Sequence, residues 1–343
     1  MKKWCVMLIC GLLLTGCGGI GSLEYYEQGT ECLLNEDYEQ AAQLFTQAVE
    51  EGERLPESYR GLGISLLESG DNAAAIAAFS RSLNELEGTN IEFETDVMYY
   101  LAEARKDYGE YEKAAEVYTD ILKLREDPEA YYRRGNIYLE LEEYDKAVAD
   151  FDAALDDSRD YDRYIDIYYL YREKEMNLEG EAILMRALEI EPENAADYCA
   201  RGKVCYVMQD YEGAKQELKQ ALEGNDQEAV LMLGKVYLAM EDVASARSMY
   251  QDYLNGDENK AKAYNGLAMC DIYEKNYDSA LENITKGLAC EDESEEQNLR
   301  FNEIVVYEYK LDFDTARTKM ETYLELYPDD EEALREAEFL STR

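Results

Sequence analysis

The residues of this sequence that could carry out chemistry are carboxylates, tyrosines and cysteines. Its 343 residues include 77 Asp and Glu, 31 Tyr and eight Cys, but no histidine. Without histidine the chain lacks the usual general base, the Ser-His and Cys-His nucleophile pairs, and the most common zinc ligand. Catalysis would have to use carboxylates, Tyr, Cys or Lys alone. We therefore predict that the chain is not an enzyme and that it uses no cofactor.

A dense group of carboxylates between Asp156 and Asp162 is the nearest approach to a calcium-binding loop. A calcium loop of the helix-loop-helix type has Gly at its sixth position and Glu at its twelfth. This segment has neither residue at those positions. A solvated acidic loop is the favoured interpretation, and we predict no metal site.

The cysteines do not have the spacing of a zinc site or a disulfide framework. Cys5, Cys10 and Cys17 lie near the amino terminus, and the remaining five are Cys32, Cys199, Cys205, Cys270 and Cys290. Five is an odd number and no CxxC pair occurs among them. We favour free, packed thiols. A Cys199–Cys205 bridge is the weaker alternative, because a spacing of six residues on one helix is too long for disulfide geometry.

The charge of the chain restricts the partners that it can bind. The formal net charge is −43 and the isoelectric point is near 4.2. Such a chain cannot attract a polyanion, so we predict no nucleic-acid binding. A hydrophobic content of 46% indicates a folded chain, not an acidic disordered tail. Only four prolines occur, which favours long helices over a β-rich fold.

The amino-terminal residues predict export. Lys2 and Lys3 precede an apolar run from Trp4 to Leu14 that is too short to span a bilayer. Residues 1–16 are therefore predicted to be a secretory signal peptide. The sequence Leu14-Thr15-Gly16-Cys17 resembles the lipobox of bacterial lipoproteins. This resemblance implies that Cys17 is lipidated, that residues 17–21 are a short linker, and that the protein is anchored to the cell membrane on its extracytoplasmic face. An ordinary signal peptide cleaved nearby is the alternative.

One segment recurs along the chain with a period near 34 residues. Examples are Gly109-Glu-Tyr111-Glu-Lys-Ala114 and Gln209-Asp-Tyr211-Glu-Gly-Ala214. Aligned on this segment, the repeats begin near residues 22, 56, 95, 128, 161, 195, 227, 261 and 297. We therefore expect nine units, each made of two helices.

Two residue types keep a constant spacing in the second helix of all nine units. A small residue opens that helix, at Ala41, Ala75, Ala114, Ala147, Gly180, Ala214, Ala246, Ala280 and Ala316. Four positions later comes a large apolar residue, at Phe45, Phe79, Tyr118, Phe151, Leu184, Leu218, Tyr250, Ile284 and Met320. This spacing places both residues on one helical face.

The pattern resembles that of tetratricopeptide repeats over residues 22–330. The resemblance implies an all-α, right-handed α-solenoid of about nine helix-turn-helix units in one continuous stack, followed by a C-terminal cap helix in residues 331–343. We expect Ala333, Leu334, Ala337 and Leu340 to share the apolar face of that cap.

Three places depart from the pattern. The fifth unit has Tyr168 where Gly or Ala is expected, and the ninth has Arg300 and Ile304 in its first helix. Either unit is expected to pack loosely or to bend the array. Extra residues between Leu86 and Thr95 predict a longer loop before the third unit.

The resemblance also implies a binding face, because such arrays line a concave groove with positions two, five, nine and twelve of their first helices. The groove residues that we predict from these positions are Tyr99, Tyr132, Asn136, Tyr169, Arg172, Lys203, Tyr206 and Lys235. Tyr beside Lys or Arg provides rigid contact area and hydrogen bonding for a peptide. The alternative is that these cations neutralise neighbouring carboxylates and the tyrosines fill ordinary helix contacts.

Together these features predict a membrane-anchored adaptor that binds a protein or an extended peptide in the cell envelope. A glycan- or solute-binding surface lipoprotein is the first alternative, and an acidic surface protein that buffers cations is the second. The sequence leaves the partner and the oligomeric state open.

Overall fold

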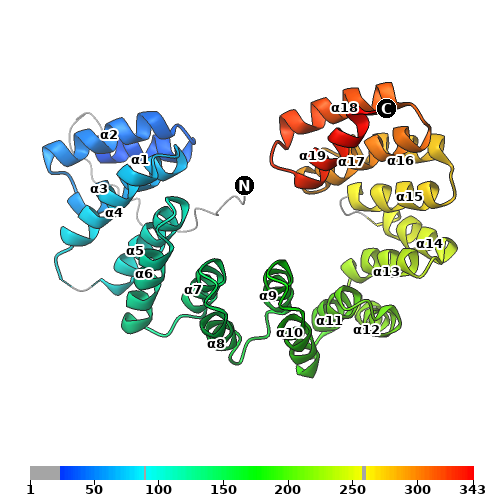
Figure 1. Cartoon of the computed structure of the whole chain (residues 1–343), viewed down its shortest axis with the longest axis horizontal. Helices are drawn as coiled ribbons and strands as arrows, with labels where there is room; N and C mark the ends of the chain where they lie inside the picture. The colour runs from blue at the N-terminus through cyan, green and yellow to red at the C-terminus, as the bar shows by residue number, and fades with distance from the viewer. Residues whose placement is uncertain (1–23, 89, 257–259) are drawn as a thin grey trace. The chain divides into compact units, whose positions relative to one another are not determined.

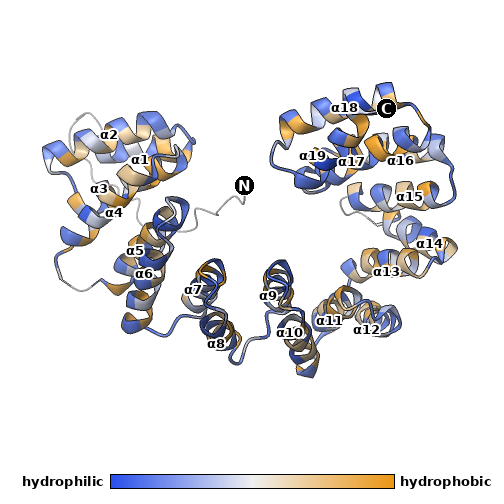
Figure 2. Cartoon of the chain, in the orientation of Figure 1, coloured by the Kyte–Doolittle hydropathy of each residue, from blue (hydrophilic) through white to orange (hydrophobic). Residues whose placement is uncertain are grey.

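The computed structural model describes residues 24–88, 90–256 and 260–343. Within these ranges all regular secondary structure is helical, in nineteen helices that pair into hairpins (Figure 1). The helices carry both hydrophobic and hydrophilic residues, as amphipathic helices do (Figure 2). The predicted all-α fold of solenoid-like helical hairpins is confirmed.

The chain divides into two compact units, Met1–Asp156 and Asp157–Arg343. The first contains α1 (Tyr25–Leu34), α2 (Tyr38–Glu51), α3 (Leu55–Glu68), α4 (Asn72–Asn84), α5 (Ile91–Asp107), α6 (Tyr111–Leu124), α7 (Pro128–Glu140) and α8 (Tyr144–Ala154). The second contains α9 (Tyr161–Glu173), α10 (Asn177–Glu189), α11 (Ala195–Val207), α12 (Tyr211–Glu223), α13 (Glu228–Ala239), α14 (Val243–Leu254), α15 (Ala261–Tyr273), α16 (Tyr277–Leu288), α17 (Glu293–Tyr309), α18 (Phe313–Leu326) and α19 (Glu331–Ser341).

The boundary falls between α8 and α9, in the acidic segment of residues 156–160. All five residues of that segment are polar. Each unit has hydrophobic clusters of its own, and we describe each unit by itself.

The turn inside each hairpin follows one backbone pattern, which the turn between α11 and α12 illustrates. Gln209 adopts a left-handed conformation with φ of 62°, and the next residue, Asp210, donates its N–H to the carbonyl oxygen of Cys205 at 2.9 Å. These are the features of a Schellman C-terminus. The Asp210 side chain then accepts a hydrogen bond from the Gly213 N–H at 3.0 Å and so caps α12. One short turn therefore ends the first helix and begins the second.

The small and large residues that recur in the sequence form the core of the hairpins. All nine small residues are buried, and the nine large ones are at most 2% exposed. Several of the large residues face glycines in the first helices: a Cβ atom on Gly63 would lie 2.5 Å from Phe79, and one on Gly202 would lie 2.5 Å from Leu218. Such distances are shorter than atomic contact allows, so the close approach of the two helices requires glycine at these positions.

The fifth hairpin has a large residue in its first helix where the others have a small one, and it does not leave a gap. The large residue in the first helix is Tyr168, and the small residue in the second helix is Gly180. A Cβ atom on Gly180 would lie 3.1 Å from the ring of Tyr168. The absence of a methyl group at Gly180 therefore provides space for the Tyr168 ring. At this point the hairpin is closely packed and not loose.

The expected long loop before the third unit is wrong in part. Only residues 85–90 separate α4 from α5, and Ile91 to Thr95 belong to α5. Asn90 caps this helix by accepting a hydrogen bond from the Phe93 N–H at 3.2 Å. Glu92 and Glu94 lie in its first turn, where negative charge stabilises the helix dipole. Part of the extra sequence therefore lengthens α5.

The hydrophobic core is a series of clusters, each shared by neighbouring helices. The cluster at the carboxyl-terminal end joins α17, α18 and α19 and contains Ile304, Ala316, Met320, Tyr323, Ala333 and Leu340. The cap helix thus uses Ala333 and Leu340 as expected. Leu334 is 48% exposed, contrary to the prediction, because it follows Ala333 by one position and points to another side of the helix.

The five cysteines of the described residues are all free thiols, as predicted. Cys199, Cys205 and Cys270 are buried, whereas Cys290 is exposed. Among the described helices, none combines the length and the apolar character needed to cross a bilayer. The predicted signal peptide, the lipidated Cys17 and the linker of residues 17–21 lie outside the described residues.

Candidate functional site

The first helices of the hairpins form a continuous layer within the second unit. Each of α9, α11, α13 and α15 contacts the next first helix, up to α17. Successive second helices make at most isolated contacts with one another. Helices of a curved stack come together on its inner side and separate on its outer side. The first helices therefore line the inner side of this unit, as their labels in Figure 1 show.

On α9 the inner side presents an exposed tyrosine and an exposed arginine. Tyr169 is 44% exposed, and its ring packs edge-on against Tyr168 with the ring centres 5.2 Å apart. The Arg172 guanidinium lies 5.8 Å from the centre of the Tyr169 ring. Arg172 takes part in no ion pair between the described residues. Tyr169 and Arg172 therefore form an accessible pair that offers an aromatic surface and a positive charge.

The equivalent positions on α11 hold Lys203 and Tyr206, both half-buried. The Lys203 Nζ binds Glu228 Oε1 of α13 at 2.9 Å. Burial disfavours the charged form of Lys203, but the hydrogen bond and the charge of Glu228 outweigh it, so its pKa is raised. Lys203 therefore joins two repeats, in agreement with the alternative that cations neutralise neighbouring carboxylates.

Tyr206 lies among other tyrosines of this unit. Burial raises its pKa, and so do the neighbouring phenols of Tyr211, Tyr169 and Tyr273. The ring centre of Tyr206 is 5.8 Å from that of Tyr211. Tyr273, at the end of α15, is 50% exposed. Sequence reasoning missed Tyr273 because it lies one position beyond those taken from the repeat pattern.

Lys235 completes the predicted residues of the second unit. It lies on α13, is exposed, and takes part in no ion pair between the described residues. Lys235 and Arg172 are thus open cations on the inner helices of a chain with 77 acidic and 34 basic residues. They can contact a partner without breaking an existing ion pair.

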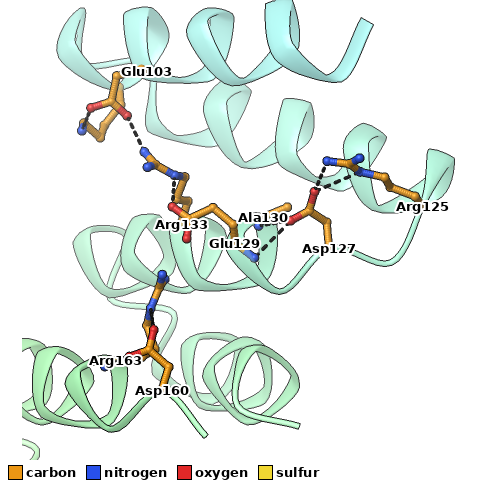
Figure 3. A network of polar contacts seen from close by, with 9 residues as sticks. Glu103, Arg125, Asp127, Glu129, Ala130, Arg133, Asp160 and Arg163 are labelled. Carbon is orange, nitrogen blue, oxygen red and sulfur yellow. Dashed lines mark hydrogen bonds and ion pairs between the residues drawn. The ribbon is translucent and has the colours of Figure 1, made fainter. Parts of the chain in front are cut away.

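In the first unit, Tyr99 is held within the hairpins. Its ring packs edge-on against Tyr118 with the centres 5.8 Å apart, and its hydroxyl oxygen is buried. Burial is the main reason that its pKa is raised, and the nearby charge of Asp127 adds to it. Asp127 caps α7 and also binds Arg125 at 2.7 Å (Figure 3). The hydroxyl group of Tyr99 is therefore not available to a partner.

A polar network around Arg133 occupies the same region. Figure 3 shows Arg133 of α7 between Glu103 of α5 and Glu129 of its own helix. Arg133 Nε is 2.6 Å from Glu129 Oε1, and Nη1 is 3.6 Å from Glu103 Oε2. Its guanidinium also lies 5.8 Å from the centre of the Tyr99 ring. These groups stabilise the packing of α5 against α7.

Tyr132 and Asn136 of α7 are the other residues predicted in the first unit. Both are half-buried, and the Tyr132 ring centre is 6.0 Å from that of Phe151. The structure therefore places Tyr169, Arg172, Lys203, Tyr206 and Lys235 on the first helices of the second unit. Tyr99, Tyr132 and Asn136 belong to the first compact unit. Within it the ring of Tyr99 packs against Tyr118 and that of Tyr132 against Phe151.

The candidate surface is open and not enclosed. An open depression of about 400 Å³ in the first unit is lined by α6 side chains with Tyr138 and Lys146, and none of the predicted groove residues lines it. A small-molecule site would instead be a deep, mostly apolar pocket. An open layer of tyrosines and cations suits a protein surface or an extended chain.

Comparison with known proteins agrees with this architecture. Residues 26–88, 128–156 and 228–259 each match a profile of the tetratricopeptide repeat. These three segments match tetratricopeptide repeats. Tetratricopeptide repeats are generally non-enzymatic scaffolds for binding proteins and peptides. No protein of curated function matches the sequence.

Several solved structures are similar to this chain. One is a tetratricopeptide repeat protein from Parabacteroides merdae ATCC 43184, which is 21% identical over 72% of this chain and 97% of its own, with a TM-score of 0.41. The C-terminal part of a repeat-containing protein from Cytophaga hutchinsonii is 14% identical over 71% and 99%, with a TM-score of 0.43. YrrB, a repeat protein with an unusual peptide-binding site, is 26% identical over 51% and 93%, with a TM-score of 0.33. At these TM-scores the likenesses assign no partner to this chain.

Proposed function

We propose that this chain is a lipid-anchored extracytoplasmic adaptor that holds a protein or an extended peptide against the inner helices of its second unit. The observation that carries the proposal is that two open cations, Arg172 beside the exposed ring of Tyr169 on α9 and Lys235 on α13, lie in one layer of helices. An acidic chain has many carboxylates with which to pair its basic residues. Two cations without such partners, in one layer of helices, are best explained by contact with another molecule.

The lipid anchor is supported by the sequence at the amino terminus. Two lysines, a short apolar run and Leu14-Thr15-Gly16-Cys17 have the order of a lipoprotein signal. Only Gly18 to Gly21 separate Cys17 from the predicted start of the repeats. The repeats of the first unit would therefore begin close to the membrane surface.

A photocrosslinking experiment in intact cells tests the inner surface. A photoreactive residue at position 169 should capture one protein, whereas the same residue at position 185 should not. Met185 is a matched control because it is 60% exposed but lies on α10, the second helix of the same hairpin. Equal capture from both positions, or none from position 169, would contradict the proposed surface.

Charge reversal identifies the contribution of the cations. Arg172→Glu with Lys235→Glu should weaken binding of the captured protein to the lipid-free chain by at least tenfold, about 1.4 kcal/mol. Lys219→Glu is the control, because Lys219 is exposed on the second helix α12. If all variants bind with the affinity of the wild type, the adaptor surface lies elsewhere.

The tyrosines favour a second candidate function, the binding of a glycan. Tyr169 and Tyr273 are exposed, and both lie near Tyr206. Exposed aromatic rings can stack on sugars. Titration with neutral oligosaccharides, followed by tyrosine fluorescence, distinguishes this candidate from the adaptor. A saturable change that Tyr169→Ala and Tyr273→Ala abolish would favour the glycan.

A further inference from the structure

Two carboxyl groups meet between the last hairpin and the cap helix. The carboxyl group of Glu308, near the end of α17, lies close enough to that of Glu336 in α19 for the two charges to interact. The Oε1 atom of Glu308 is buried and has no hydrogen-bond partner among the described residues. A buried acceptor without a donor is costly. A proton shared between the two carboxyl groups would provide the missing donor.

The basic side chains of the last hairpin and the cap helix are already bound to other carboxylates. On α17 and α18, Lys310 pairs with Asp278 of α16, Lys319 with Glu303 at 2.9 Å, and Arg317 with Asp314. On α19, Arg335 pairs with Glu331 at 3.5 Å, and on α15, Asp271 pairs with Arg247 at 2.8 Å. None of the ion pairs between described residues includes Glu308 or Glu336. The two carboxyl groups therefore meet without a cation to separate them.

We propose that Glu308 and Glu336 share one proton when the cap helix is docked, so that the cap is held firmly in acid and loosened as the pH rises. When both groups are ionised, two negative charges meet in a half-buried site and repel each other. When one is protonated, the same pair forms a hydrogen bond that joins α17 to α19.

The electrostatics of the pair agree with this direction. Burial first, and then the charge of Glu336, raise the pKa of Glu308 to about 7. An exposed Glu in an undocked cap has an ordinary pKa of about 4.3. A carboxyl whose pKa is raised by docking stabilises the docked form below its ordinary pKa, and this stabilisation is lost as the pH rises toward 7.

The two ends of the cap helix are held differently. At its start, Asp330 accepts hydrogen bonds from Gln297 Nε2 at 3.1 Å and from the Tyr323 hydroxyl at 2.5 Å. At its end, Leu340 is buried, and its carbonyl oxygen accepts a hydrogen bond from Arg317 at 3.4 Å. Glu336 lies between these anchors, so ionisation of Glu308 beside it should free the carboxyl-terminal half of α19 first and uncover Met320 and Ile304.

Hydrogen exchange of the lipid-free chain between pH 5 and 8 tests the proposal, after correction for the intrinsic pH dependence of exchange. Protection of the amides from Glu336 to Leu340 should fall by up to about tenfold per pH unit between pH 5 and 7, and then level off. The amides of α13 provide an internal reference. Protection of α19 that stays constant over this range would overturn the proposal.

Two variants and one control make the test specific. In Glu336→Gln and in Glu308→Gln the amide supplies the missing donor at every pH, so the cap should remain protected at pH 8. Glu332→Gln changes an exposed carboxyl of the same helix and should keep the wild-type pH dependence. If both Gln variants of the pair also keep that dependence, the carboxyl pair is not its cause.

Discussion

The ring of Tyr168 in α9 occupies the space that the missing methyl group of Gly180 leaves in α10. A Cβ atom at Gly180 would lie 3.1 Å from that ring. In the other eight hairpins the second helix opens with alanine. This hairpin therefore accommodates a large residue in its first helix by having glycine instead of alanine in its second helix.

A double-mutant cycle at these positions has an expected sign. Ala is favoured over Gly inside a helix by about 1 kcal/mol. In the wild-type background, Gly180→Ala should gain little of this stability, because the methyl group of the new alanine would press on the Tyr168 ring. In the Tyr168→Ala background the same change should stabilise the chain by about 1 kcal/mol in urea unfolding. Equal effects of Gly180→Ala in the two backgrounds would show that the residues are not coupled.

The turns inside the hairpins predict a stabilising substitution. Leu311 has φ of 60°, a left-handed conformation that is strained for a residue with a side chain. Its side chain is 73% exposed, so few contacts offset this strain. Leu311→Gly should raise the free energy of unfolding by about 1 kcal/mol. Leu334→Gly is the control, because Leu334 is exposed inside α19 and its replacement should cost about 1 kcal/mol. Both changes can be measured by thermal unfolding, and destabilisation by Leu311→Gly would contradict the argument.

The pH dependence of the first unit should follow Glu68. Burial first, then the charges of Glu36 and Asp107, raise its pKa above the ordinary value of 4.5. A raised carboxyl pKa means that the folded chain binds this proton more tightly than the unfolded chain. Stability from this group is therefore present in acid and is lost as the pH rises through the raised pKa.

Glu68→Gln isolates this effect. The variant should melt at a higher temperature than the wild type at pH 7, and the difference should shrink as the pH falls to 4. Glu39→Gln, which changes an exposed carboxyl on α2, should show no such trend. A difference between Glu68→Gln and the wild type that stays constant with pH would mean that the effect is not one of protonation.

The proposed anchor depends on one thiol. Cys17→Ser should move the protein from the membrane fraction to the soluble extracytoplasmic fraction, because serine cannot form the thioether to the lipid. Cys290→Ser is the control, since this thiol is exposed within the described residues and its loss should leave the protein with the membrane. Mass analysis of the amino-terminal peptide checks the modification directly. A Cys17→Ser protein that remains membrane-bound would exclude the lipid anchor at this residue.

The local features of the fold could be predicted from the sequence. Ala and Phe at a spacing of four mark the packing of two helices within one hairpin, so the pattern is complete within about 34 residues. The same logic placed the buried residues Ala333 and Leu340 in the cap. It placed Leu334 wrongly, because one helical position decides which side chain is covered.

Contacts between repeats were harder to predict. The pattern gave Tyr99 an inner position, but the charges of Asp127 and Arg133 that surround it come from another hairpin. Glu308 and Glu336 are 28 residues apart (336 − 308) on helices that are not paired as a hairpin. Nothing in the spacing of either residue distinguishes it from the other 76 (77 − 1) Asp and Glu residues. Such pairs depend on side-chain geometry and not on periodicity.

The division of the core into clusters has a thermodynamic consequence. The cluster of α17, α18 and α19 shares no residue with the cluster of α11, α12 and α13. A loss of stability in one cluster therefore destabilises mainly the neighbouring clusters. Heating should melt the protein in successive steps and not in a single all-or-none transition, so the calorimetric enthalpy should exceed the van't Hoff enthalpy.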